Sequence, residues 1–129
     1  MELHFGELTE RVRLLGVDAP ESVSPSVPEQ CFGAEASLAL AELLPPGTVV
    51  TVTRDIEARD RYDRLLLYLH RSNDGLFVNR WLIDSGLADA VAYEPNTAHR
   101  TEFDRARRQA EAGGIGLWGR CDGPDQPLL

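Results

Sequence analysis

Four charged residues in two short segments have the types that phosphodiester hydrolysis needs. The segment RVRLLGVDAPES carries Arg13, Asp18 and Glu21, and Arg64 lies in RDRYDRLLLYL. An arginine can bond two phosphate oxygens at once, a carboxylate can orient or deprotonate a water, and a divalent cation held by carboxylates neutralises further charge. Together the four residues supply the parts of a phosphodiesterase site.

Each of these residues also has an ordinary structural interpretation. Residues 18–20 are typical of a simple turn, and Arg13 could be a solvent-facing strand residue. The alternating arginines and aspartates of residues 59–64 could form a solvated loop whose charges neutralise one another. Tyr62 and Tyr93, taken alone, are more typical of half-buried packing residues than of surfaces for bases.

The composition is that of one globular domain. The chain has 129 residues, 43% hydrophobic and 26% charged, with a net charge of −8. This charge argues against loose binding of nucleic acid over the whole surface. No apolar run approaches the roughly 18–20 residues of a membrane span, and MELHFGELTE shows no signal peptide. Two cysteines and three scattered histidines predict no zinc site.

Apolar periodicity and the turn residues predict strands followed by helices. We expect strands at 2–5, 11–17, 48–56 and 64–70, a proline-broken loop at 22–30, and helices at 33–44, 76–86 and 97–114. The stripes predicted to face the core are Ala34, Leu38 and Ala41 in the first helix, and Phe103, Ala106 and Ala110 in the last. This order predicts an α+β fold, with helices on a small, strongly bent antiparallel sheet or barrel.

The spacing of Arg13 and Asp18 makes a local prediction. The two residues are five apart, so a straight strand would send their side chains to opposite faces. For both to line one cleft, the strand must end or bulge between them. We therefore predict a strand end or bulge at residues 15–17, with Gly16 at the break.

The segments quoted above, with CFGAEAS, VNRWLIDSGLA, AYEPN and GLWGRC, resemble the staphylococcal-nuclease-like (thermonuclease) family. The resemblance runs from about Glu10 to Cys121. It implies a five-stranded barrel of the oligonucleotide-binding type with three helices, a domain over residues 1–121 with a tail at 122–129, and calcium-dependent hydrolysis of DNA and RNA.

The resemblance also implies a role for each residue. Arg13 would contact the scissile phosphate and Arg64 would stabilise the transition state. Glu21 would position or activate the water, Asp18 would ligate Ca²⁺, and Ala19 would ligate it through its backbone carbonyl. The family further suggests three phosphate or base contacts, namely Arg61, Tyr62 and Tyr93.

The chain departs from the family at its start and at Asp63. Relatives usually begin with a strand and a D-G-D-T-like turn whose second aspartate binds calcium, whereas MELHFGEL aligns just after that turn. We weigh three explanations: a shortened or wrongly assigned start, a truncated and inactive relative, and a strand-donating partner or homodimer across the exposed sheet edge. Asp63 replaces the frequent glycine and would lower activity.

Some relatives carry cysteines at the positions of Cys31 and Cys121, which suggests a disulfide bridge between them. The alternative is two reduced, buried thiols. A bridge would favour an extracellular or otherwise extracytoplasmic location.

Three functions follow as hypotheses. The first is a calcium-dependent endonuclease acting on single-stranded DNA and RNA. The second is a catalytically impaired module that binds nucleic acid or protein, which the missing strand and ligand would favour. The third is a secreted, disulfide-bonded domain with no role on nucleic acid, which fits the acidity but leaves the arginine spacing unexplained.

Overall fold

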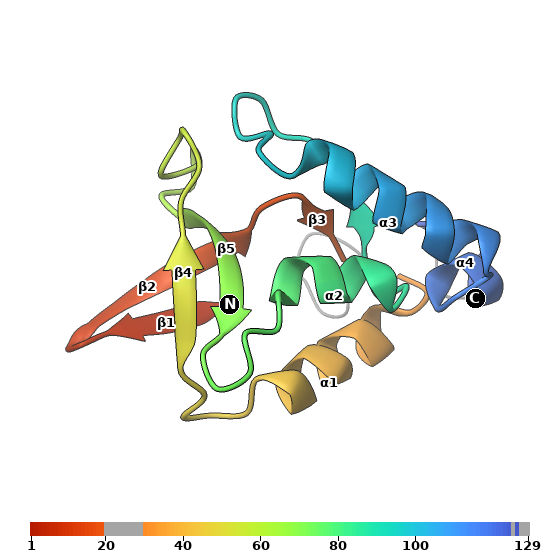
Figure 1. Ribbon diagram of the computed structural model, residues 1–129. Helices are drawn as coiled ribbons and strands as arrows, with labels where there is room; N and C mark the ends of the chain where they lie inside the picture. The colour runs from red at the N-terminus through yellow and green to blue at the C-terminus, as the bar shows by residue number, and fades with distance from the viewer. Residues whose placement is uncertain (20–29, 125, 127–129) are drawn as a thin grey trace.

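The computed structural model describes residues 1–19, 30–124 and 126, in which the helices lie beside a four-stranded sheet and a second, two-stranded sheet lies among the helices (Figure 1). The elements are β1 (Glu2–Phe5), β2 (Leu8–Leu14), β3 (Val17–Asp18), α1 (Gly33–Leu43), β4 (Val50–Thr53), β5 (Leu65–Arg71), α2 (Val78–Asp84), β6 (Asp89–Ala90), α3 (Arg100–Ala112) and α4 (Leu117–Arg120). The loop predicted at 22–30 lies almost wholly outside the described residues.

The main sheet has the order β1-β2-β5-β4. β1 and β2 form an antiparallel hairpin, as do β4 and β5, but β2 and β5 run parallel. The expected purely antiparallel sheet is therefore wrong at this central pairing. The reason is connectivity: α1 and β4 lie between β2 and β5 in the chain, and the β4–β5 hairpin returns β5 in the direction of β2. The α+β class is confirmed.

The core lies between β5 and the helices that cover one side of the sheet (Figure 1). Leu67 and Leu69 of β5 are 2% and 0% exposed, and they belong to one cluster with Ile83 of α2 and Phe103 of α3. Burying a leucine or isoleucine side chain stabilises the fold by roughly 1.5–3 kcal/mol. The apolar run in β5 is thus explained by the burial of residues 66–69, whereas both ends of the strand are half-buried.

Asn79, at the start of α2, is a fully buried polar residue that ties β2 to β5. Its Oδ1 accepts the backbone N–H of Leu69 at 2.9 Å, and its Nδ2 donates to the carbonyl oxygens of Leu15 at 2.8 Å and Leu67 at 3.3 Å. Buried polar groups are stable only when they are paired in this way. The contact to Leu15 fixes the end of β2, two residues after Arg13.

β2 ends where the spacing of Arg13 and Asp18 predicted a break. The strand stops at Leu14, Gly16 has φ +79°, and β3 begins at Val17 and pairs with β6. A Cβ added at Gly16 would lie 2.5 Å from two ring atoms of Phe103. Glycine is therefore required at the break both by the backbone conformation and by the close approach of α3.

The three predicted helices are confirmed, but only the last has the predicted buried face. Phe103, Ala106 and Ala110 of α3 are all buried. In α1, by contrast, Leu38 is 61% exposed, and Ala36 is buried in its place. The predicted stripe of α1 is wrong because the helix is rotated relative to it.

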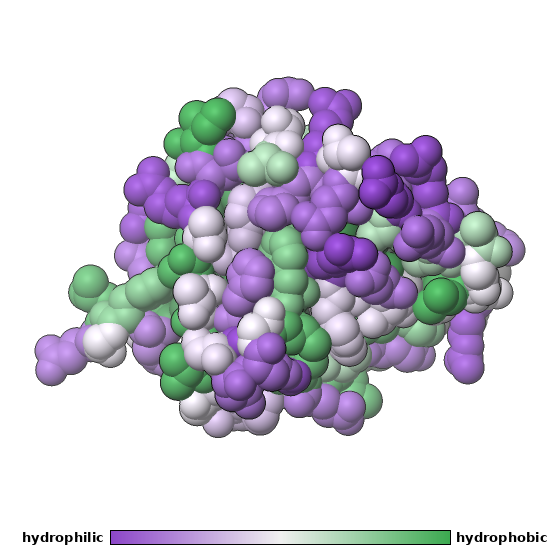
Figure 2. Space-filling model, in the orientation of Figure 1, coloured by the Kyte–Doolittle hydropathy of each residue, from purple (hydrophilic) through white to green (hydrophobic). Residues whose placement is uncertain are grey.

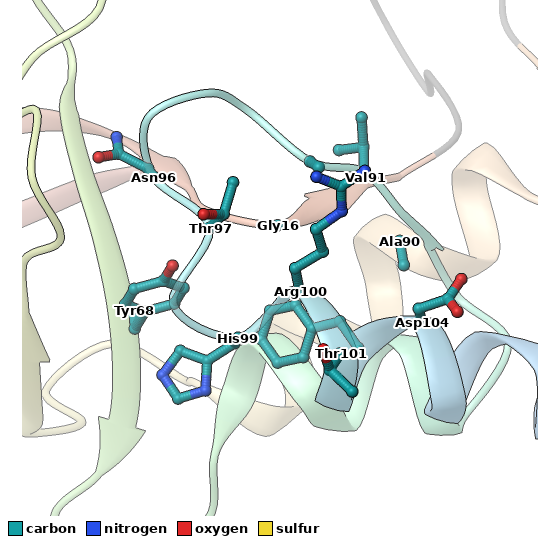
Figure 3. Close-up of a pocket in the computed structure, with 12 residues that line it drawn as sticks. Gly16, Tyr68, Ala90, Val91, Asn96, Thr97, His99, Arg100, Thr101 and Asp104 are labelled. Atoms are coloured by element: carbon teal, nitrogen blue, oxygen red, sulfur yellow. The ribbon is translucent and has the colours of Figure 1, made fainter.

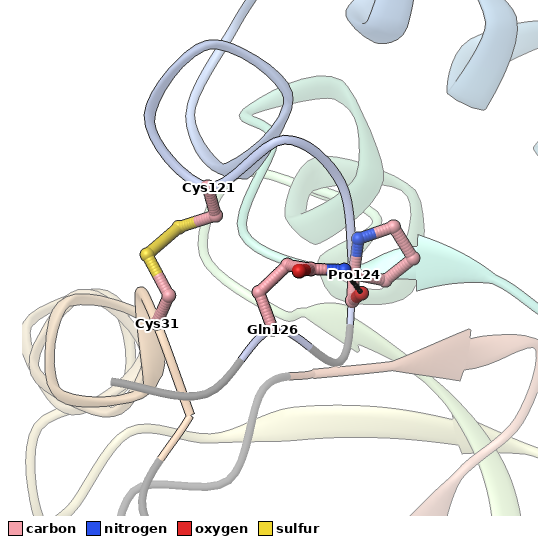
Figure 4. Close-up of a disulfide and its surroundings, with 4 residues drawn as sticks. All are labelled: Cys31, Cys121, Pro124 and Gln126. Atoms are coloured by element: carbon pink, nitrogen blue, oxygen red, sulfur yellow. Dashed lines mark hydrogen bonds between the residues drawn. A yellow bond between two sulfur atoms is a disulfide. The ribbon is translucent and has the colours of Figure 1, made fainter. Parts of the chain in front are cut away.

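A disulfide joins Cys31, just before α1, to Cys121, at the end of α4 (Figure 4). The two Cα atoms are 5.8 Å apart and the residues are separated by 90 positions. The Cys31 N–H also donates to the carbonyl oxygen of Gln126 at 2.8 Å. The predicted bridge is confirmed.

The visible surface is mostly polar, with scattered apolar patches over the main sheet (Figure 2). Exposed apolar side chains in or next to the strands of the main sheet include Phe5, Leu8 and Val49. Among the described residues, none of the helices combines the length and the apolar character that a membrane span requires.

Candidate active site

Arg13 is held at the break between β2 and β3. Its Nη1 donates to the carbonyl oxygens of Leu14 at 3.3 Å and Val17 at 3.0 Å, one on each side of the break. Its Nη2 donates to the Tyr93 hydroxyl at 2.6 Å, and its Cζ lies 5.2 Å from the centre of the Tyr93 ring. These contacts fix the guanidinium in one orientation.

Arg64 is held just before β5 by Asp60. Its Nε donates to Oδ2 of Asp60 at 2.8 Å, while Oδ1 of Asp60 accepts the backbone N–H groups of Tyr62 and Arg64, each at 3.0 Å. Partial burial acts to raise the pKa of Asp60, but the hydrogen bonds from Arg64 and Tyr62 outweigh it and hold this pKa below its usual range. Asp60 therefore remains a charged partner for Arg64.

Arg13 lies in β2 and Arg64 just before β5, the neighbouring strand of the main sheet, and both arginines line the same cavities. One cavity, of about 510 Å³, is lined by Arg13, Arg64, Asp18 and Ala19 among other residues. A second, of about 370 Å³, is lined by Arg13, Arg64 and Tyr93 together with residues of the 57–62 loop. Arg13, Arg64 and Tyr93 line both cavities, which together make up the arginine site.

Aromatic rings flank this site. Tyr62 is 53% exposed and Tyr93 is 42% exposed. The Cζ atoms of Arg61 and Arg64 lie 4.8 and 5.4 Å from the centre of the Tyr62 ring, and Nη2 of Arg61 donates to the Tyr62 hydroxyl at 2.6 Å. Exposed rings beside guanidinium groups can stack on bases while the arginines bond phosphates.

Asp18 and Ala19 stand at the end of β3 and line the larger cavity. Carboxylate and carbonyl oxygens are the donors that Ca²⁺ prefers, so these residues fit the ion in kind. Calcium takes roughly six to eight oxygens, so further ligands are needed. Within residues 1–19, 30–124 and 126, no cluster of three or more histidine, cysteine, aspartate or glutamate side chains could hold a metal. Glu21, the predicted water-activating residue, lies outside the described residues.

Two residues near the site were not predicted to act there. The sequence suggests for Asp60 only a charge in a self-neutralising loop, and for Asn96 it suggests no role at the site. The Asn96 side chain accepts from the Glu57 N–H at 2.7 Å and donates to the Glu57 carbonyl at 3.2 Å. It thereby joins the 57–62 loop to the loop that carries Tyr93. An aspartate four residues before an arginine was the only available signal for Asp60.

A third cavity, of about 390 Å³, lies between the loop of residues 91–97 and α3 (Figure 3). Tyr68 and His99 lie side by side there, with ring centres 4.5 Å apart. The Tyr68 hydroxyl donates to Asp55 at 2.7 Å. Burial and this bond raise the pKa of Tyr68. None of the described predicted site residues lines this cavity, although Asn96 lines both it and the smaller arginine cavity.

A curled, mixed sheet with helices against one side, and with its arginines around one cavity, defines a domain of the oligonucleotide-binding class. The chain belongs to the staphylococcal nuclease homologue family, whose model matches residues 11–120. The family resemblance of the sequence is thereby confirmed.

The curated relatives carry nuclease names. The chain is 36% identical over 111 residues to a protein named thermonuclease from Staphylococcus intermedius. The aligned region covers 86% of this chain and 64% of that protein. It is 34% identical over 110 residues to endonuclease YncB from Bacillus subtilis strain 168, and the aligned region covers 84% of this chain and 51% of that protein. The chain thus spans between half and two thirds of the length of these two relatives.

Proposed function

We propose that this protein is a calcium-dependent endonuclease that hydrolyses phosphodiester bonds in single-stranded DNA and RNA. The observation that carries the proposal is the meeting of Arg13 and Arg64 in one cavity with Asp18 and Ala19. A pair of fixed guanidinium groups suits a phosphate, because each arginine can donate two hydrogen bonds to its oxygens. The nuclease names of the relatives support the same reaction class.

Each residue of the site has its own role in the proposed reaction. Arg13 binds the oxygens of the scissile phosphate, and Arg64 stabilises the charge that gathers on them in the transition state. Glu21 takes a proton from the water whose oxygen attacks phosphorus; the bond to the leaving sugar oxygen breaks, and that oxygen is then protonated from solvent. Calcium, held by Asp18 and the Ala19 carbonyl with further ligands, would supply positive charge at the phosphate. Arg61, Tyr62 and Tyr93 hold the flanking nucleotides.

Cleavage of single-stranded DNA in the presence of calcium tests this proposal. We expect the wild type to cleave, and Arg13→Ala and Arg64→Ala each to lose about 100- to 1,000-fold in kcat, as when a transition-state donor is removed. Arg108→Ala is the matched control, because Arg108 is a 64% exposed arginine paired with Asp104 on α3. An inactive wild type, or full activity in Arg64→Ala, would contradict the proposal.

The second candidate is a module that binds nucleic acid without cleaving it. Among the described residues, Asp18 is the only carboxylate that lines the larger arginine cavity, and calcium affinity depends on the number of charged ligands. Saturable binding of a fluorescent oligonucleotide, with no cleavage products at millimolar calcium, would favour this module over the enzyme.

We further propose that a strand from a partner or from a second copy of this chain pairs with the main sheet. In the described part of the chain, β1 and β4 are the outer strands of that sheet, and both line a cavity of about 440 Å³. Open strand edges favour such pairing. A molar mass measured by light scattering would separate a dimer from a monomer.

The disulfide supports an extracytoplasmic location.

A further inference from the structure

We propose that Asp60 is a positioning residue that aims the guanidinium of Arg64 at the phosphate. The inference rests on the proposed function and assigns to it a residue outside the predicted site set. It is drawn from the contacts of one carboxylate, whose two oxygens have different partners.

The first oxygen shapes the loop. Oδ1 of Asp60 accepts the backbone N–H groups of Tyr62 and Arg64, and the Asp60 N–H in turn donates to the Arg64 carbonyl oxygen at 3.0 Å. The Asp63 N–H closes the turn by donating to the Asp60 carbonyl oxygen at 3.0 Å. Residues 60–64 therefore form a compact loop with the Asp60 side chain at its centre.

The second oxygen holds the side chain of Arg64. Oδ2 of Asp60 accepts from Nε at 2.8 Å, and the two side chains are 19% and 34% exposed. Among the described residues, no hydrogen bond joins either Nη of Arg64 to another protein group. An arginine bound through Nε alone keeps the edge formed by its two Nη groups for a second, bidentate partner.

Arg64 lines the two cavities that Arg13 also lines. Without the Asp60 contact, the long side chain of Arg64 would regain rotamer freedom, which costs free energy whenever a phosphate has to order it again. Preorganisation of this kind acts on the transition state, because the charge there is greatest. We therefore expect the loss of the contact to appear in kcat.

Asp60→Asn isolates the second oxygen from the first. The asparagine Oδ1 can still accept the two backbone N–H groups, whereas an NH₂ group replaces Oδ2 and cannot accept from Nε of Arg64. We expect kcat on single-stranded DNA to fall by about 10- to 100-fold, the size of effect typical of residues that orient a functional group. We expect KM to change by less than about three-fold, because the ground-state contacts of Arg13 are retained.

Two further variants make the test specific. Asp63→Asn removes the same charge from the same loop, but its carboxylate is 82% exposed and lies 3.6 Å from Arg59; it should not lower kcat. In an Arg64→Ala background, Asp60→Asn should cause no additional loss, because the two residues act as one unit. Full activity of Asp60→Asn, or a loss that adds to that of Arg64→Ala, would overturn the positioning role.

A measurement without substrate separates this inference from the proposed function. In NMR spectra of the free protein, the Arg64 Nε–H should exchange slowly with water in the wild type and about ten-fold or more faster in Asp60→Asn. Equal exchange rates would overturn the contact itself. If the wild type cleaves DNA and Asp60→Asn is equally active, only the positioning role is overturned. If the wild type does not cleave, the proposed function is overturned and the positioning role with it.

Discussion

At the scale of single residues, the chemistry depends on how each charge is held. Arg13 is fixed by two backbone carbonyls and a tyrosine hydroxyl, and Arg64 by one carboxylate. The sequence allowed us to predict both arginines, because arginine beside acids in this order resembles one family. It did not identify Asp60, because an aspartate among several arginines can pair with any of them until the turn fixes its neighbours.

Asp63 adds a negative charge next in sequence to Arg64, where the substrate is itself negatively charged. It lies between Tyr62 and Arg64 in the chain, it has φ +63°, and its side chain is 82% exposed at 3.6 Å from Arg59. Asparagine tolerates the left-handed conformation as well as aspartate does, so Asp63→Asn changes the charge alone. One unit charge at several ångströms in water predicts a rise of about two-fold in kcat/KM on single-stranded DNA.

The salt dependence decides whether that rise is electrostatic. Measured at about 20 mM salt the gain should be present, and at about 500 mM it should vanish, because the screening length falls to a few ångströms. A gain that persists at high salt would show that the substitution acts through the shape of the loop instead.

At the scale of elements, a helix was predicted well where its outer face is charged. In α3, the charged residues between Phe103, Ala106 and Ala110 leave only one apolar stripe, and that stripe is buried. In α1, alanine and leucine occupy seven of the eleven positions, so more than one apolar stripe fits the sequence. No short sequence motif indicates that β2 and β5 pair in parallel, because the direction of β5 depends on the elements that lie between the two strands in the chain.

The break between β2 and β3 is an element boundary that a glycine determines. Gly16→Ala would place a Cβ 2.5 Å from the Phe103 ring at φ +79°. We expect the free energy of unfolding in urea to fall by about 2–4 kcal/mol, from backbone strain and overpacking together.

Gly75→Ala is the matched control, since Gly75 has φ +75° and nothing lies within 4 Å of an added Cβ. It should lose only the backbone contribution, about 1 kcal/mol. Combining Gly16→Ala with Phe103→Leu should recover part of the difference. If both glycine variants lose the same amount, the close approach of α3 does not matter.

At the scale of the whole molecule, several carboxylates make stability depend on pH. The hydrogen bond from Arg59 lowers the pKa of Glu10, and that from His99 lowers the pKa of Glu102. Burial acts to raise the pKa of Asp55, but hydrogen bonds from Tyr68 and backbone N–H groups outweigh it, and the net pKa is lowered.

A carboxyl whose pKa is lower in the folded state stabilises the fold above its unfolded pKa, and this stability is lost as the pH falls through the folded value. The free energy of unfolding should therefore be nearly constant above about pH 5 and decrease between about pH 5 and pH 2. Asp55→Asn and Tyr68→Phe should each reduce this decrease in urea titrations. An increase in stability on acidification would contradict the sign.

The disulfide sets the stability of the whole chain, because it joins residues 90 positions apart. Closing so long a loop restricts the unfolded chain, and the entropy model gives about 4 kcal/mol. The double variant with Cys31→Ser and Cys121→Ser should lose about that much free energy of unfolding, and the reduced wild type should lose the same amount.

Because α1 lines the arginine cavity through Gly33 and Ser37, releasing its first turn should also lower kcat at temperatures where the variant is still folded. If stability falls while kcat is unchanged below the unfolding transition, the bridge acts on the unfolded chain alone and α1 keeps its place against the site without it.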